Sequence, residues 1–185
     1  MAKIIESIPN ISEGRNKEVI EACVDQIRNT PGCTLLDYSS DETHNRSVIT
    51  YMGSPEACEE ASVKLAKKAV ELIDLTKHEG GHPRMGCVDV MPFVPIKEAT
   101  TEDCIELSKK VGERIAAEAD LPVFLYEDSA TAKHRKNLHT QITDWIGGHP
   151  LDQEHKSKKQ SPVTLRHRQA SFTLTGPICY FSFLL

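Results

Sequence analysis

Residues His78–His82 read HEGGH, which matches the H-E-x-x-H pattern of zinc-dependent proteases. In that pattern two histidines one helical turn apart bind the metal, so the segment must be helical. Gly80 and Gly81 each cost about 1 kcal/mol in a helix interior relative to alanine, and Pro83 disfavours the helical conformation at His82. No third ligand follows at a familiar spacing. The sequence therefore predicts a loop at His82 and no metal site.

A second chemistry fits this loop better. His82 follows two glycines that allow a substrate to approach closely, and Arg84 stands two residues further on. An imidazole that titrates near neutrality, beside a guanidinium that binds carboxylates, suits general acid–base catalysis on an anionic substrate. The alternative is that His82 caps the end of the preceding helix beside a surface arginine. We expect His78 and Glu79 near that helix end.

Two further polar stretches have the composition of binding loops. Residues 9–16, PNISEGRN, lead from a predicted strand into a helix N-terminus, where anions are favoured. Residues 40–47, SDETHNRS, lie between two predicted strands. The alternatives are a turn with Asn16 as the helix N-cap and an ordinary hairpin loop. If the loops gather at one rim of a sheet, they form one polar cleft with His82.

The elements that must position these loops follow from residue periodicity. Clusters of β-branched and apolar residues predict strands at residues 3–9, 33–39, 46–53, 87–96 and 121–127. Apolar residues at helical spacing predict helices at residues 16–29, at 55–72 after a Ser54 N-cap, and from Thr100 onward. The second helix should bury one apolar face made of Ala57, Ala61, Leu65, Ala69 and Leu72.

The order of these elements predicts the fold class. Up to residue 96 the order is strand–helix–strand–strand–helix–strand, which is the split βαβ pattern. It predicts an α+β fold, an α/β sandwich of the ferredoxin-like type. An antiparallel sheet would carry the helices on one face, followed by an extra helix and strand.

Composition narrows the class of protein. The chain has 185 residues and a formal net charge of −5, which gives no reason to expect nucleic acid as a partner. No apolar run approaches the roughly 20 residues of a membrane-spanning helix, and the N-terminus lacks the apolar core of a signal peptide. The six cysteines stand singly, mostly among apolar neighbours, and we expect buried free thiols. These features predict a cytoplasmic protein with no membrane partner.

The chain changes character near Gln141. Residues 1–141 form the predicted domain, whereas residues 142–185 have the composition of a loop or disordered tail. Residues 178–185, ICYFSFLL, are apolar; they would either dock on the domain as an edge strand or stay exposed. A further hypothesis is that the tail comes from alternative splicing or a misread gene boundary. We expect no chemistry from the tail.

Three motifs, IPNISEGRN, DETHNRSVITYMG and GGHPRMGCVDVMPFVPI, stand in this order in the sequence. Together they closely resemble the N-terminal subdomain of formiminotransferase, which occurs alone or joined to a cyclodeaminase. The resemblance runs from about Lys3 to about Leu138. It implies a ferredoxin-like fold, tetrahydrofolate as cosubstrate, and transfer of the formimino group of N-formimino-glutamate, a one-carbon transfer in histidine degradation.

The resemblance also implies a site. His82 matches the family's catalytic histidine, which takes the proton from N5 of tetrahydrofolate as that nitrogen attacks the formimino carbon. The same imidazole then returns a proton to the leaving glutamate amine. No metal is implied. Further motif positions expected to line the substrate cleft are Asn10, Ser12, Glu13, Asp41, Asn45, Arg46 and Arg84.

The chain departs from the family pattern after Leu138, because a complete formiminotransferase has a second, similarly folded subdomain. Folate lies between the two subdomains. One hypothesis is a transferase half that acts as a homodimer or pairs with a separate C-terminal-type subdomain. The alternative is a non-catalytic relative that binds a folate or a partner protein.

Overall fold

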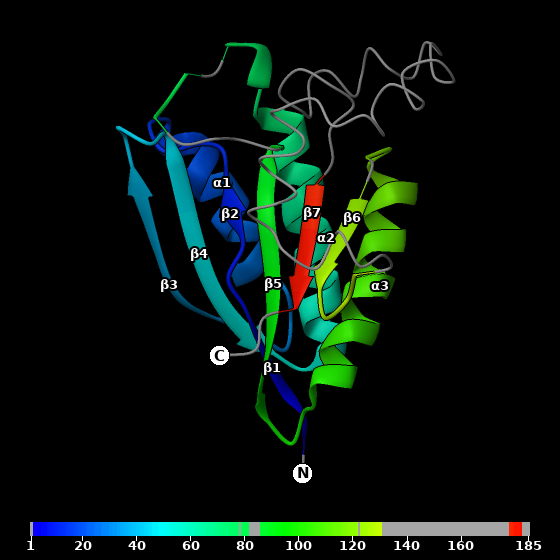
Figure 1. Ribbon diagram of the computed structural model, residues 1–185. Coiled ribbons are helices and arrows are strands. Elements are labelled where there is room, and N and C mark those ends of the chain that lie inside the picture. Colours follow the sequence, from blue (N-terminus) through cyan, green and yellow to red (C-terminus); the bar gives the residue numbers. More distant parts are fainter. Residues whose placement is uncertain (1, 78, 82–85, 122, 131–177, 183–185) are drawn as a thin grey trace, which may run out of the picture.

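The computed structural model describes residues 2–77, 79–81, 86–121, 123–130 and 178–182. Within these residues, three helices cover one face of a seven-stranded sheet (Figure 1). The predicted α+β sandwich is confirmed. The helices are α1 (Lys17–Arg28), α2 (Pro55–Leu72) and α3 (Thr101–Glu118).

The strands form a mostly antiparallel sheet. They are β1 (Ile4–Ser7), β2 (Asn10–Ile11), β3 (Cys33–Asp41), β4 (Arg46–Gly53), β5 (Val88–Lys97), β6 (Val123–Glu127) and β7 (Ile178–Ser182). The first predicted strand, residues 3–9, contains β1, and a further short strand, β2, follows in the stretch predicted as a loop; Pro9 between them has no N–H to donate to a neighbouring strand. Both parts pair with β4 on one side and β5 on the other, and β3 pairs with the far edge of β4.

The last described strand, β7, lies inside the sheet. It runs parallel to β5 and to β6 and pairs with both, so Cys179 lies opposite Val90 on one side and Phe124 on the other (Figure 1). The edge position expected for these residues is therefore wrong, because β6 lies beyond β7. Pairing on both sides satisfies the backbone groups of β7 and of the β5 edge that it covers.

The second and third helices begin where the sequence placed them, after Ser54 and Thr100, and Asn16 caps α1 as in the alternative to a binding loop. The side chain of Asn16 accepts hydrogen bonds from the backbone at the start of α1, and Ser54 does the same for α2. Thr100 and Asp103 form a reciprocal capping box on α3. Each cap depends on residues only two or three positions away, which explains why the sequence predicts it.

The second helix ends at Leu72, where the sequence predicted, but the predicted burial of this last residue is wrong. Ala57, Ala61, Leu65 and Ala69 are buried as expected, but Leu72 is 39% exposed because α2 ends at this residue. A 3-10 turn, η1 (Leu75–Lys77), follows. Glu79 therefore lies beyond this turn and not at the end of α2, and Glu79–Gly81 are not helical.

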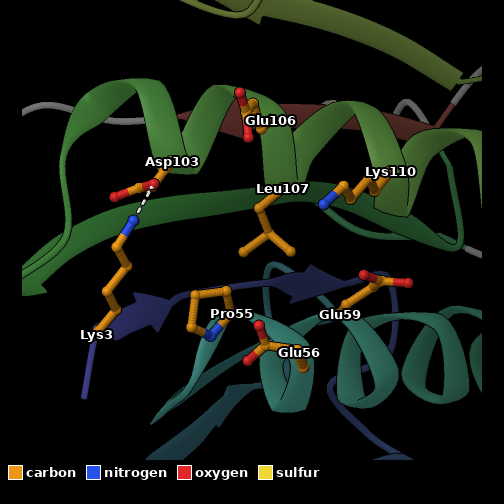
Figure 2. A pocket seen from close by; sticks show the side chains of 8 residues that line it. All are labelled: Lys3, Pro55, Glu56, Glu59, Asp103, Glu106, Leu107 and Lys110. Carbon is orange, nitrogen blue, oxygen red and sulfur yellow. Dashed lines mark hydrogen bonds and ion pairs between the residues drawn. The ribbon is translucent and has the colours of Figure 1, made fainter.

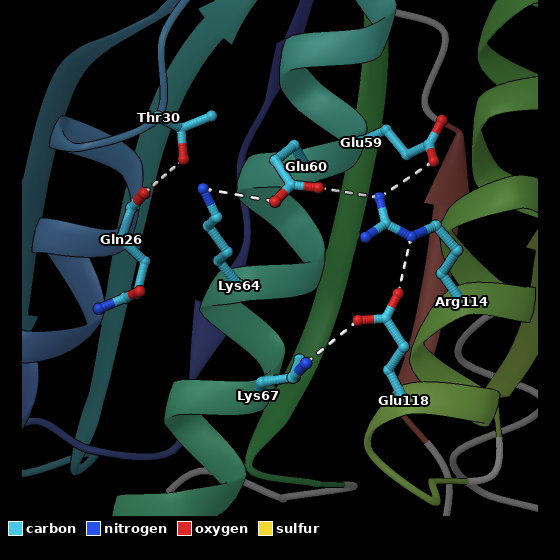
Figure 3. Close-up of polar contacts among 8 residues, drawn as sticks. All are labelled: Gln26, Thr30, Glu59, Glu60, Lys64, Lys67, Arg114 and Glu118. Carbon is cyan, nitrogen blue, oxygen red and sulfur yellow. Dashed lines mark hydrogen bonds and ion pairs between the residues drawn. The ribbon is translucent and has the colours of Figure 1, made fainter.

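The outer faces of α2 and α3 are joined by ion pairs. Arg114 of α3 lies 3.1 Å from Glu59 and 3.0 Å from Glu60 of α2, and 2.9 Å from Glu118 of its own helix. Glu118 also lies 3.1 Å from Lys67 of α2 (Figure 3). These side chains are about a quarter to a half exposed, so the network adds little free energy of folding in water.

The cysteines agree with the predicted free thiols. Among the described side chains, Cys33 is half-buried and the others are buried, and all of them are reduced: Cys23, Cys33, Cys58, Cys87 and Cys104. In the described part of the chain, no helix is long and apolar enough to cross a membrane.

Candidate functional site

Three loops carry the polar motifs, and the fold brings them to the same end of the sheet. The first loop (residues 12–16) joins β2 to α1, and the hairpin loop (residues 41–46) joins β3 to β4. The third loop (residues 79–87) leads into β5; of it, residues 79–81 and 86–87 are described. The three loops are directly hydrogen-bonded to one another, as the following contacts show.

The first loop lies tightly against the hairpin loop at Gly14. The backbone N–H of Gly14 donates to Oδ1 of Asn45 over 2.9 Å. A Cβ at Gly14 would overlap the backbone oxygen of Asp41 and lie 2.5 Å from the backbone nitrogen of Arg46. The hydroxyl of Ser47 donates to the backbone oxygen of Glu13 in the same contact. Only glycine permits this approach of the two backbones.

The third loop is tied to both of the others on each side of residues 82–85. Before them, Nδ2 of Asn45 donates to the backbone oxygen of Glu79 (2.9 Å), and the Gly81 N–H donates to the backbone oxygen of Thr43 (3.1 Å). After them, the Ser12 hydroxyl donates to the backbone oxygen of Gly86 over 2.8 Å. The described neighbours of residues 82–85 are thus fixed to the first loop and the hairpin loop.

The predicted catalytic residue, His82, lies outside the described residues, and so do Arg84 and His78. The roles predicted for them therefore stay predictions. The strand that follows is described. Asp89 is buried in β5, and its Oδ1 accepts a hydrogen bond from the backbone N–H of Gly86 over 3.2 Å. The buried Asp89 carboxylate is therefore hydrogen-bonded to the end of the third loop.

The N-terminus of α1 is occupied by side chains of the first loop itself. Oε1 of Glu13 accepts hydrogen bonds from the backbone N–H groups of Arg15 (2.8 Å) and Asn16 (2.9 Å). Asn16 caps the N–H groups of Glu18 and Val19, which is the alternative that the sequence left open. The positive end of the helix is thus paired with the protein's own carboxylate, and this explains why a glutamate stands here.

In the hairpin loop, the Asp41 carboxylate contacts both the backbone N–H and the imidazole of His44. Oδ1 of Asp41 accepts a hydrogen bond from the backbone N–H of His44 over 2.7 Å, and Nδ1 of the same imidazole lies 3.1 Å away. These contacts, the backbone one first, lower the pKa of the Asp41 carboxyl below its ordinary value. Both side chains are exposed, so the pair shapes the loop without being removed from solvent.

The helix-free face of the sheet presents two of the predicted residues. The side chains of β4 point alternately to the two faces of the sheet. That of Tyr51 points to the helices, where its hydroxyl lies 2.6 Å from Oγ of Ser62. Arg46 and Val48 therefore point to the opposite, helix-free face. Asn10 is the cross-strand partner of Val48 and lies on the same face. Arg46 and Asn10 are both half-exposed there, next to the three loops.

The described candidate residues thus fall into two groups. The side chains that bond to the backbone of their own or neighbouring loops are those of Ser12, Glu13, Asp41 and Asn45. Asn10 and Arg46 differ from these in position, since both present half-buried side chains to the helix-free face, where Nδ2 of Asn10 donates to the backbone oxygen of Ile8 over 3.1 Å. The sequence analysis did not single out Gly14, although a glycine inside a polar loop is an ordinary signal of close backbone approach.

A hollow lies at the other end of the sheet and contains none of these residues. It has a volume of about 190 Å³ and lies between the first turns of α2 and α3 (Figure 2). Lys3 ion-pairs there with Asp103 over 2.6 Å. The length of β4 separates this hollow from the three loops. No group of three metal-ligating side chains occurs among the described residues, which exclude His78 and His82.

Comparisons with known proteins place these motifs in a family. The family model described as the formiminotransferase domain, N-terminal subdomain, matches residues 4–168, which extends past Leu138. Glutamate formimidoyltransferase of Streptococcus pyogenes is 58% identical over 138 residues, covering 75% of this chain and 46% of that protein. The protein of the same name from Thermoplasma acidophilum is 37% identical over 135 residues, covering 73% and 45%.

A longer relative shows the same partial coverage. Formimidoyltransferase-cyclodeaminase of Gallus gallus is 47% identical over 138 residues, which cover 75% of this chain and 26% of that protein. The chain therefore spans about half, or less, of the length of these curated relatives.

Proposed function

Because this chain belongs to the family of formiminotransferase N-terminal subdomains, we propose that it is half of a folate-dependent transferase. The reaction is transfer of the formimidoyl group from N-formimino-L-glutamate to tetrahydrofolate. The observation that carries the proposal is the junction of the three loops around Asn45. It fixes residues 81 and 86, and so the two ends of the segment that contains His82.

In the proposed reaction His82 is the general base and then the general acid. N5 of tetrahydrofolate attacks the formimino carbon and gives its proton to the imidazole. The tetrahedral intermediate collapses, the bond from carbon to the glutamate nitrogen breaks, and the imidazolium returns the proton to the departing amine. A positioned base of this kind contributes typically about 10²–10⁴-fold to the rate.

The helix-free face is the proposed side of substrate binding. Both substrates carry glutamate carboxylates, which suit the guanidinium groups of Arg46 and Arg84. Asn10 offers an amide on the same face as Arg46, and the exposed Asp41 carboxylate stands at the rim of the hairpin loop. We propose no metal in this reaction, since proton transfer and orientation account for it.

The other half of the proposed binding site must come from a second subdomain. The chain spans 46% of the Streptococcus pyogenes relative, which leaves room in that protein for a further unit of similar size. In the proposed assembly, another copy of this chain or a C-terminal-type subdomain supplies the second unit. In the proposed division, residues 1–141 form the catalytic half and residues 142–185 a divergent segment. The proposal also includes three expectations from the sequence: that the fold is of the ferredoxin-like type, that the reaction belongs to histidine degradation, and that the protein is cytoplasmic.

The test is formimidoyl transfer by the purified full chain across a series of protein concentrations. Pairing of two copies predicts a rate that rises faster than linearly with protein concentration. His82→Ala should abolish the rate, while Lys110→Ala, in the hollow at the other end of the sheet, should leave it unchanged.

The alternative function is binding of a folate or a partner without catalysis, favoured by the partial coverage of the relatives. Titration of tetrahydrofolate into the same protein by calorimetry distinguishes the two. Binding without turnover at every protein concentration supports the alternative. Turnover that survives His82→Ala contradicts the proposed role of that histidine.

A further inference from the structure

Asn45 occupies an unusual position in the hairpin loop. The residue is buried, with 4% of its surface exposed, although it lies in a polar loop between the exposed His44 and the half-buried Arg46. Its backbone has φ of 52°, in the left-handed region that asparagine enters more readily than other residues with a side chain. This backbone conformation turns the carboxamide inward, between the other two loops.

The carboxamide uses both of its ends on backbone groups. Oδ1 accepts from the N–H of Gly14 in the first loop, and Nδ2 donates to the backbone oxygen of Glu79 in the third loop, each over 2.9 Å. The two bonds have opposite polarity, so they also fix the orientation of the amide plane. A buried amide held in this way spans the gap between two segments that lie more than 60 positions apart in the sequence.

We propose that Asn45 is a positioning residue of the transfer site, which sets the distance between the first loop and residues 79–81 and does not itself contact a substrate. This inference rests on the proposed function for its catalytic consequence. The coupling of the two loops stands on the hydrogen bonds alone. Gly81 is two residues from Glu79 and directly precedes His82, so a shift at Glu79 moves the point from which the His82 segment starts.

Three properties make asparagine the fitting residue here. Aspartate keeps the shape but offers no donor to Glu79 and places a negative charge beside its carbonyl. Glycine adopts the same φ without strain but makes neither bond. Glutamine has the same functional group one methylene further out, which a buried site cannot accept without displacing a loop. The variants therefore separate the two bonds from the backbone conformation.

The direct test is amide hydrogen exchange, resolved by residue with NMR, on the full chain and its Asn45→Asp and Asn45→Gly variants. In Asn45→Asp we expect the Gly14 amide to keep its protection, while the Gly81 amide exchanges about 10-fold faster or more. In Asn45→Gly we expect both amides to lose protection. Asn29→Asp is the matched control, because the Asn29 amide also donates to a backbone oxygen, that of Asp25, but at the far end of α1.

A kinetic test separates positioning from substrate contact. With the assembly that shows transfer, we expect Asn45→Asp to lower kcat about 10–100-fold and to change KM for either substrate by less than about 3-fold. A raised KM with unchanged kcat would mean that Asn45 binds substrate, which overturns the proposal. Unchanged exchange at Gly81 in both variants overturns it as well. If no assembly of the wild-type chain shows transfer, the proposed function fails, and the exchange data still decide whether Asn45 couples the loops.

Discussion

Replacing Gly14 with alanine tests the packing of the loops more severely than any surface substitution. The added Cβ would overlap the backbone oxygen of Asp41 and lie 2.5 Å from the backbone nitrogen of Arg46. Neither obstacle is a flexible side chain, so the first loop and the hairpin loop must move apart. Such overpacking costs about 1–3 kcal/mol. The movement also lengthens the bond from Gly14 to Asn45 and that from Ser47 to the first loop, each a net contribution of about 1 kcal/mol.

The sum for Gly14→Ala is about 3–5 kcal/mol, which lowers Tm by about 6–20 °C in a chain of this size. Calorimetry or circular dichroism measures this shift. Gly81→Ala is the matched control in the same group of loops, because the nearest atom among the described residues, the backbone oxygen of Thr43, lies 3.8 Å from the added Cβ. We expect it to lower Tm by no more than about 2 °C. Equal effects of the two substitutions would refute the close approach at Gly14.

Three further predictions concern charges and thiols. The pKa of the Asp41 carboxyl, lowered first by the backbone N–H of His44 and then by its imidazole, should lie below its ordinary range in an NMR titration, and His44→Ala should raise it only in part. The stability from this contact is present at neutral pH and is lost as pH falls through the lowered pKa. A midpoint at the ordinary value in the wild type would contradict this prediction. Arg114→Ala should cost less than about 1 kcal/mol in urea unfolding, and less at high salt, because the ion pairs of Arg114 are partly exposed; a larger, salt-independent loss would argue against this. At pH 8 a thiol reagent should modify Cys33 well before the buried thiols, because burial raises the pKa values of Cys23, Cys87 and Cys104 to about 12. Mass spectrometry of peptides measures the labelling rates. Equal rates in the folded protein would contradict the predicted order.

The sequence predicted those parts of the fold that depend on neighbouring residues. The Ser54 cap of α2 and the start of α3 after Thr100 each depend on residues within three positions of one another. The cluster of β-branched and apolar residues in Arg46–Gly53 predicted β4, and one face of that strand is buried throughout. At Leu72, which is 39% exposed, periodicity alone predicted the wrong side.

The parts that the sequence did not predict depend on pairings between distant segments. The position of β7 between β5 and β6 joins residues near 90, 125 and 180, and no local pattern specifies which strand edge is available. The same limit applies to the loops. The motifs at Asn10–Asn16 and Asp41–Arg46 marked the correct segments, but which side chains bond to backbone and which face solvent follows only from the contacts among the loops.

These contacts change the interpretation of individual residues within one motif. Ser12 and Asn45 are buried and bonded to backbone oxygens, whereas Arg46, the neighbour of Asn45 in sequence, presents a half-exposed side chain to the helix-free face. Polar residues in a loop motif therefore differ in burial, and the buried ones hold the loop. Burial distinguishes them, and residue type does not.

The most direct test of the central claim is a chimaera with the Streptococcus pyogenes relative. Its 138 matched residues are replaced by those of this chain, which are 58% identical, and formimidoyl transfer to tetrahydrofolate is measured with and without His82→Ala. If this chain is a catalytic half that uses His82, the chimaera should turn over within about 10-fold of its parent, and His82→Ala should lower the rate by about 10² or more. A folded chimaera that binds tetrahydrofolate without transferring the group, or one that keeps its rate in His82→Ala, would contradict the account.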